Sequence, residues 1–162
     1  MEWTTLAATL LGATIAMGST VLVEVRKDRR ETAGEWRRSK RELYSSYLAT
    51  LAQVRSDLQV IVLDRSLPDA ERIVVARQTF ARCYELRYQL EVFAPRAVVE
   101  PALTYFRSVR KLRDATGTGM ENGDEECERI FPEVMNSLAD VRTAMRRDMG
   151  TDALATGAFR SS

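Results

Sequence analysis

Few residue types in this 162-residue chain could perform chemistry, and those present exclude most catalytic sites. The chain has no histidine, which removes the commonest general base and the commonest zinc ligand. Its two cysteines, Cys83 and Cys127, both fall on apolar helical stripes, where they could face each other as small buried hydrophobic groups. No Gly-x-Ser-x-Gly elbow, Ser-x-x-Lys motif, Walker loop or dinucleotide fingerprint occurs. We therefore expect no enzyme activity, no metal site and no cofactor.

The basic residues offer binding chemistry instead. Residues 26–42 carry eight bases and four acids, a net charge of +4 in a chain whose total is +1. Each base near an anionic membrane surface contributes about 1 kcal/mol of attraction. We expect the first four of these bases to contact lipid headgroups: Arg26, Lys27, Arg29 and Arg30. The low net charge of the whole chain argues against a nucleic-acid partner.

An uncharged stretch of 21 residues, 3–23, precedes these bases and contains 13 apolar residues, six Ser or Thr and two Gly. As a helix it would span about 31 Å, which matches the hydrocarbon core of a bilayer. Two alternatives are an export signal and a buried helix of a soluble protein. The acidic start, with Glu2 before Trp3, argues against a signal, and the absence of a polar face argues against the buried helix. We expect a transmembrane helix over residues 1–25.

The flanking charges predict the orientation of this span. Bases beside a span resist translocation, and here they lie only on its C-terminal side. The expected location is the cell inner membrane, crossed once, with the N-terminus outside and most of the chain in the cytoplasm. Ala8, Gly12 and Ala16 form a small-residue stripe that would let two such helices approach closely, so a homodimer through this face is one expected partner.

Four helical segments follow, each with one narrow apolar stripe. The first segment runs to about Asp64, and its stripe is Trp36, Leu43, Tyr47, Leu51, Val54, Leu58 and Ile61. The second ends near Phe93, and its stripe is Ile73, Ala76, Phe80, Cys83, Leu86, Leu90 and Phe93. Ser66 followed by Asp69 resembles a capping box at its start, and Pro95 ends it.

The last two segments have equally regular spacing. The third runs from about Pro95 to Thr116, and its stripe is Val98, Ala102, Tyr105, Val109 and Leu112. Pro101 predicts either a later start or a bend. The fourth opens with acids, ends at Gly150, and its stripe is Cys127, Phe131, Val134, Leu138, Val141 and Met145.

These patterns predict an all-α fold, in which an N-terminal transmembrane helix continues into an antiparallel four-helix bundle. We expect four parts: the transmembrane helix over 1–25, a basic juxtamembrane helix over 26–42, a cytoplasmic bundle over 43–149, and a disordered tail over 150–162.

Three stretches are similar to those of small, mostly uncharacterised actinobacterial helical proteins with an N-terminal membrane anchor: YSSYLATLAQVR at 44–55, VVEPALTYFRSVRKLRDA at 98–115 and AMRRDMG at 144–150. The resemblance implies an apolar N-terminus and an Arg-rich helical body, and it implies no activity or site residues. 

From all these features we expect a non-catalytic scaffold or regulatory subunit of a membrane complex, whose partners are the bilayer and an unidentified membrane or cytoplasmic protein. Two alternatives stay open: an accessory protein of a mobile element or envelope process, and a bundle that senses a ligand.

Overall fold

The computed structural model of the protein describes residues 34–64 and 66–151, and in this part of the chain every regular element is a helix. Residues 34–63 are helical, followed by α2 (Asp69–Ala81), α3 (Cys83–Phe93), α4 (Arg96–Gly117) and α5 (Glu125–Asp148). Residues 34–39 belong to a separate N-terminal unit, whereas the chain from Lys40 onward forms one compact unit. The predicted all-α class is confirmed for these residues.

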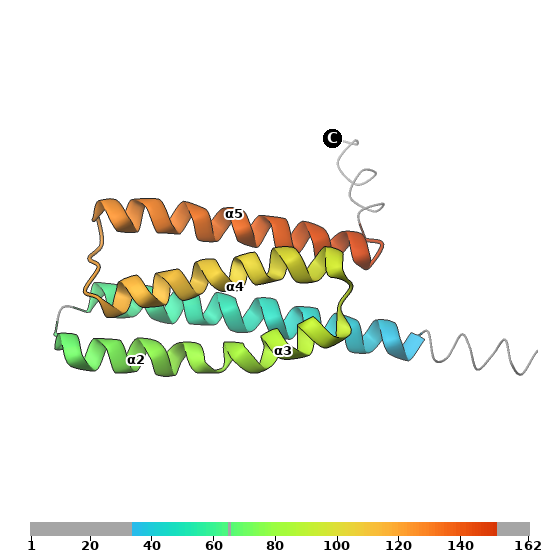
Figure 1. The fold of residues 1–162 in the computed structure, drawn as a ribbon, viewed down its shortest axis with the longest axis horizontal. Helices are drawn as coiled ribbons and strands as arrows, with labels where there is room; N and C mark the ends of the chain where they lie inside the picture. Colours follow the sequence, from blue (N-terminus) through green and yellow to red (C-terminus); the bar gives the residue numbers. More distant parts are fainter. Residues whose placement is uncertain (1–33, 65, 152–162) are drawn as a thin grey trace, which may run out of the picture. The chain divides into compact units, whose positions relative to one another are not determined.

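The helices of the compact unit pack side by side with alternating direction (Figure 1). Two side-chain pairs, Ser108 with Ser137 and Lys111 with Glu133, show that α4 and α5 run antiparallel, because one number rises as the other falls. Tyr44 with Asp148 and Arg55 with Met135 give the same result for residues 40–63 against α5. Together with α2 and α3, which follow one another along one side, these helices form an up-down bundle.

Glycine ends the two longest labelled helices in the same way. After α4, Gly119 has a φ of +91°, Met120 N–H donates to Ala115 O, and Gly119 N–H donates to Thr116 O. After α5, Gly150 has a φ of +69° and the corresponding two bonds reach Arg146 O and Arg147 O. Both are Schellman motifs, in which a left-handed residue satisfies the last carbonyl groups of a helix. The predicted stop at Gly150 is therefore confirmed.

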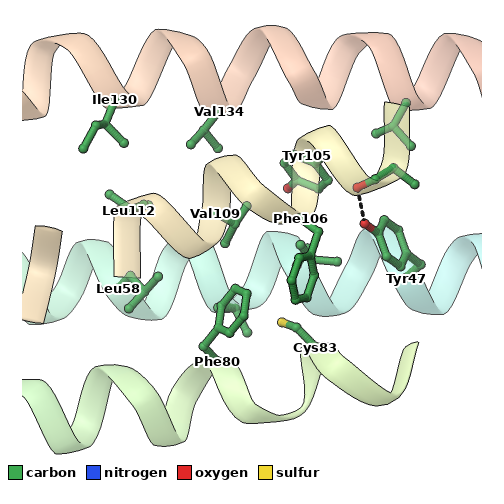
Figure 2. Packing of buried hydrophobic residues seen from close by; sticks show 14 of the residues in the cluster. Tyr47, Leu58, Phe80, Cys83, Tyr105, Phe106, Val109, Leu112, Ile130 and Val134 are labelled. Carbon is green, nitrogen blue, oxygen red and sulfur yellow. Dashed lines mark hydrogen bonds between the residues drawn. The ribbon is translucent and has the colours of Figure 1, made fainter. Parts of the chain in front are cut away.

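A single apolar core fills the space between the helices (Figure 2). The largest fully buried side chains are Tyr47, Tyr105, Phe80, Phe106, Leu51, Leu58, Leu90, Leu112, Ile130, Val54, Val98 and Val109. The buried Tyr47 hydroxyl donates a hydrogen bond of 2.6 Å to Ala102 O on α4, drawn as the dashed line in Figure 2. The stripe predicted for α4 is buried at every position, from Val98 to Leu112.

Two serines face each other inside this core. Their Oγ atoms, from Ser108 on α4 and Ser137 on α5, lie 2.7 Å apart and both residues are buried. Ser108 Oγ also lies 2.8 Å from Tyr105 O, and Ser137 Oγ lies 2.9 Å from Val134 O. Each hydroxyl has one proton, so one serine donates to the other while the second donates to its own helix.

Aromatic rings and arginines close the core where α2, α3 and α4 meet. The rings of Phe80, Tyr84 and Phe106 lie 5.0 to 5.6 Å apart between centroids, in edge-on or tilted arrangements. The Arg113 guanidinium lies 4.8 Å from the centre of the Phe80 ring, and Arg87 lies 5.4 Å from that of Phe106. Favourable ring–ring and cation–π contacts therefore add to the apolar burial at this site.

The region before α2 differs from the prediction. Ser66 does not cap the helix, because its hydroxyl and its N–H both donate to Asp64 Oδ1, and Pro68 is the N-cap residue. The guanidinium of Arg72 donates to carbonyl groups of the preceding segment, with Nη2 at 3.3 Å from Asp64 O and 3.4 Å from Leu67 O. The expected single helix up to Phe93 is interrupted at Arg82, although that residue keeps near-helical angles of φ −63° and ψ −17°.

Several predicted stripe positions were also wrong. Ile73 and Phe93, which lie on either side of the interruption at Arg82, are exposed. Trp36 is 49% exposed. On α5 the predicted positions Phe131 and Leu138 are only partly buried, and their neighbours Ile130 and Ser137 are buried instead. The other predicted positions of α5 are buried: Cys127, Val134, Val141 and Met145. Helix α4 begins at Arg96 and contains Pro101, so the predicted start near Pro95 is confirmed and the alternative of a later start is excluded.

Candidate functional site

A hollow of about 450 Å³ lies between residues 41–48 and the C-terminal turns of α5. We call it the arginine-rimmed hollow, and its lining residues are Arg41, Tyr44, Ser45, Leu48, Arg142, Met145, Arg146, Met149 and Thr151. The two walls are neighbouring antiparallel helices, joined at this level by a hydrogen bond of 2.7 Å from Tyr44 Oη to Asp148 Oδ2. The Schellman motif at Gly150 turns the chain so that Thr151 completes the lining.

The charge of this hollow is positive. Arg41, Arg142 and Arg146 are exposed at its rim, and none of the described residues that line it is acidic. The carboxylate of Asp148, which links the two walls, accepts the bond from Tyr44 and lies 3.0 Å from Lys40 Nζ. Burial, followed by this hydrogen bond and the charge of Asp148, raises the pKa of the Tyr44 phenol, so the hydroxyl stays protonated and continues to donate.

The floor of the hollow is apolar. Tyr44 and Met145 are buried beneath it, while Leu48 and Met149 are partly buried and reach its surface. Methionine side chains are flexible and polarizable, so they adapt to guests of different shape. An apolar floor beneath a cationic rim is suited to a molecule that has both an apolar portion and a negative charge.

A smaller hollow of about 220 Å³ lies between α2 and the end of α4. Its lining residues are Ile73, Arg77, Arg113, Asp114, Gly117 and Thr118. Here Arg113 already pairs with Asp114 and stacks on the Phe80 ring, so its charge is largely satisfied within the fold. This hollow is a weaker binding candidate than the arginine-rimmed hollow.

The two cysteines are structural groups in the described part of the chain. Cys83 and Cys127 are both buried and neither forms a disulfide. Burial raises the pKa of the Cys83 thiol to about 11, and the positive charge of Arg82 only partly offsets this effect. Since the thiolate is the reactive and metal-binding form, Cys83 has little nucleophilic character at neutral pH. Among the described residues, no group of three potential metal ligands comes together.

The raised pKa of Cys83 predicts a loss of stability in alkaline solution. In the folded protein the pKa of this thiol is about 11, against an ordinary value of 9.0. The protonated thiol therefore stabilises the fold fully below pH 9.0, and this contribution is lost as the pH rises past about 11. We expect the free energy of unfolding to fall by about 2 kcal/mol across this interval. Urea titrations of the full chain at a series of pH values would measure it.

The matched control for this measurement is Cys83→Ala, which lacks the titrating thiol. The buried phenols of Tyr47 and Tyr105 also have raised pKa values, caused mainly by burial, so a further decline is expected above pH 10 in both proteins. An identical decline below pH 10 in the variant and the parent would contradict the assignment to Cys83.

The binding residues expected from sequence lie outside the described residues. These are the dimer face of Ala8, Gly12 and Ala16, and the headgroup contacts Arg26, Lys27, Arg29 and Arg30. Sequence reasoning missed Arg142 and Arg146, although their spacing of four beside Met145 and Met149 is visible in the sequence. What the sequence did not indicate is that Arg41 and Leu48 lie opposite them.

None of the helices in the described ranges, 34–64 and 66–151, has the length and apolar character needed to cross a bilayer. In comparisons with known proteins, the chain matches no family model, no curated protein and no solved structure. The arginine-rimmed hollow is therefore the feature on which a functional interpretation of the described residues rests.

Proposed function

We propose that this protein is a membrane-anchored helical bundle that acts by binding, as a scaffold or regulatory subunit of a membrane complex. The anchor is the uncharged stretch 3–23, and the chain is held with its N-terminus outside by the bases that follow it. The bundle from Lys40 onward is the cytoplasmic part of this proposal.

The observation that carries the binding role is the arginine-rimmed hollow. Its rim carries three exposed guanidinium groups, and its apolar lining either belongs to the core or packs against it. An exposed concave site of about 450 Å³ falls within the range of small-molecule binding sites. The same hollow favours the second candidate, a bundle that senses a ligand, over an accessory protein without a ligand site.

The anchoring part of the proposal is tested by the topology of the full chain in a bacterial host. We expect a green fluorescent protein at the C-terminus to fluoresce and an alkaline phosphatase at the same place to be inactive, because bases retain that flank in the cytoplasm. The protein should stay in the membrane pellet after carbonate extraction. Recovery of the intact chain in the soluble fraction would refute the anchor.

A variant with fewer bases beside the stretch 3–23 tests the cause of the orientation. Replacing Arg26, Lys27, Arg29 and Arg30 with Asn removes four bases beside the stretch 3–23 and leaves four in the 26–42 segment. We expect part of the population to invert, with measurable phosphatase activity at the C-terminus. The matched control replaces four bases of the bundle, Arg77, Arg107, Arg110 and Arg129, with Asn, and should leave the topology unchanged.

A further inference from the structure

The arginine-rimmed hollow has the charge of a site for an anion. Arg142 and Arg146 stand four residues apart on α5, and Arg41 faces them from the neighbouring helix. Guanidinium groups bind phosphate and carboxylate oxygens through paired, charge-assisted hydrogen bonds. The hydroxyls of Ser45 and Thr151 belong to the same lining and can donate to further oxygens.

The interior of the same hollow has the character of a site for a hydrocarbon chain. Leu48 and Met149 present partly buried apolar groups there, and Tyr44 and Met145 form a buried layer below them. A free inorganic anion would use only the rim and leave these groups in water. A ligand with an acyl chain covers them and gains the corresponding hydrophobic free energy.

The size of the site decides between a small amphiphile and a protein partner. Nine of the described residues line the hollow, and they span about two turns on each of two helices. A stable protein–protein interface takes about 20–30 residues on each side. The arginine-rimmed hollow by itself is too small for such an interface and has the size of a small-molecule site.

We propose that the arginine-rimmed hollow binds one anionic membrane lipid, with its phosphate held by Arg41, Arg142 and Arg146 and an acyl chain against Leu48 and Met149. This inference rests on the proposed membrane attachment, which supplies the lipid. The site is distinct from residues 26–30, where headgroup contacts were expected from sequence, so the two can be tested separately. Lipid occupancy would give the bundle a means to respond to membrane composition.

The test uses an oxidation footprint of the full chain in a neutral detergent. Met149 lines the hollow, whereas Met135 is 48% exposed on α5 and lies outside it. Hydrogen peroxide converts accessible methionines to sulfoxides, which peptide mass spectrometry counts residue by residue. With phosphatidylglycerol in the micelle, we expect oxidation of Met149 to slow several-fold while that of Met135 is unchanged. Phosphatidylcholine at the same concentration should protect neither.

The variant Arg142→Gln with Arg146→Gln removes two rim charges while keeping the helix. We expect it to need about tenfold more phosphatidylglycerol for the same protection of Met149, which corresponds to the loss of charge-assisted contacts at an exposed site. The matched control, Arg107→Gln with Arg110→Gln on α4, should bind like the parent, because neither residue lines the hollow. Circular dichroism of both variants verifies that the helices are intact.

Three results would overturn the proposal. Equal oxidation of Met149 with and without phosphatidylglycerol would show that no lipid occupies the hollow. Equal protection by inorganic phosphate would assign the site to a free anion, and protection by a poly-glutamate peptide with none by lipid would assign it to an acidic protein segment. Because the footprint is measured in detergent and carbonate extraction in membranes, a failure of lipid binding is distinguishable from a failure of the anchor.

Discussion

The variant Leu58→Ala should lower the free energy of unfolding by about 3 kcal/mol, because removing a fully buried leucine costs the transfer of its methyl groups and leaves a cavity. Leu58 is 0% exposed and belongs to the same buried cluster as Leu112 of α4 (Figure 2). Urea unfolding of the full chain, followed by circular dichroism, measures the change.

Leu63→Ala is the matched control, with the same substitution five residues further along the same helix. Leu63 is 63% exposed, so its removal should change the free energy of unfolding by about 0.5 kcal/mol or less. If both variants lost the same stability, the assignment of the buried face of residues 40–63 would be wrong.

Phe106→Ala should lower the free energy of unfolding by about 4 kcal/mol, which is in the middle of the range for a buried aromatic side chain. The Phe106 ring packs on those of Phe80 and Tyr84, and the Arg87 guanidinium lies over it. Truncation therefore removes ring–ring and cation–π contacts in addition to apolar burial. The midpoint of urea unfolding should move to a much lower concentration.

Tyr88→Ala controls for the loss of an aromatic ring as such. Tyr88 is 57% exposed, and the guanidinium of Arg87 lies 5.3 Å from its ring. A single exposed cation–π contact contributes about 0.5–1 kcal/mol, so the variant should lose no more than that. A loss as large as that of Phe106→Ala would place the stabilising ring cluster on the outer side of α3.

Periodicity in the sequence predicted most of the helices and much of the core. The stripe of α4 is buried at every predicted position because its apolar residues follow an unbroken 4, 3 spacing. Helix ends at proline and glycine were also predicted correctly, because Pro95 and Gly150 act through local backbone geometry. Apolar spacing and helix ends can both be predicted from a single segment of the sequence.

The wrong predictions concern residues whose burial depends on how one helix packs on another. On α5 the regular spacing favoured Phe131 and Leu138, but the fully buried residues are their neighbours Ile130 and Ser137. Ser137 is tolerated there because its hydroxyl has hydrogen-bond partners in Val134 O of its own helix and Ser108 Oγ of the facing helix. The pairing of the two serines cannot be predicted from one segment, since they lie 29 residues apart.

The arginine-rimmed hollow could not be predicted from the sequence for the same reason. Arg142 and Arg146 look like ordinary residues of a solvated helix face, and Arg41 is one of eight bases in the 26–42 segment. Only the antiparallel contact between the two helices brings them together around Met145 and Met149. A site made by two surfaces that are distant in sequence leaves no local motif.

The serine pair also favours one alignment of α4 and α5 along their lengths. Sliding one helix by a turn would separate the two hydroxyls, and each would keep only the hydrogen bond to a carbonyl of its own helix. The bond between the two serines would be lost, and such a bond contributes about 0.5–1.5 kcal/mol. Ser108 and Ser137 thus add a preference for one pairing that hydrophobic burial alone would not give.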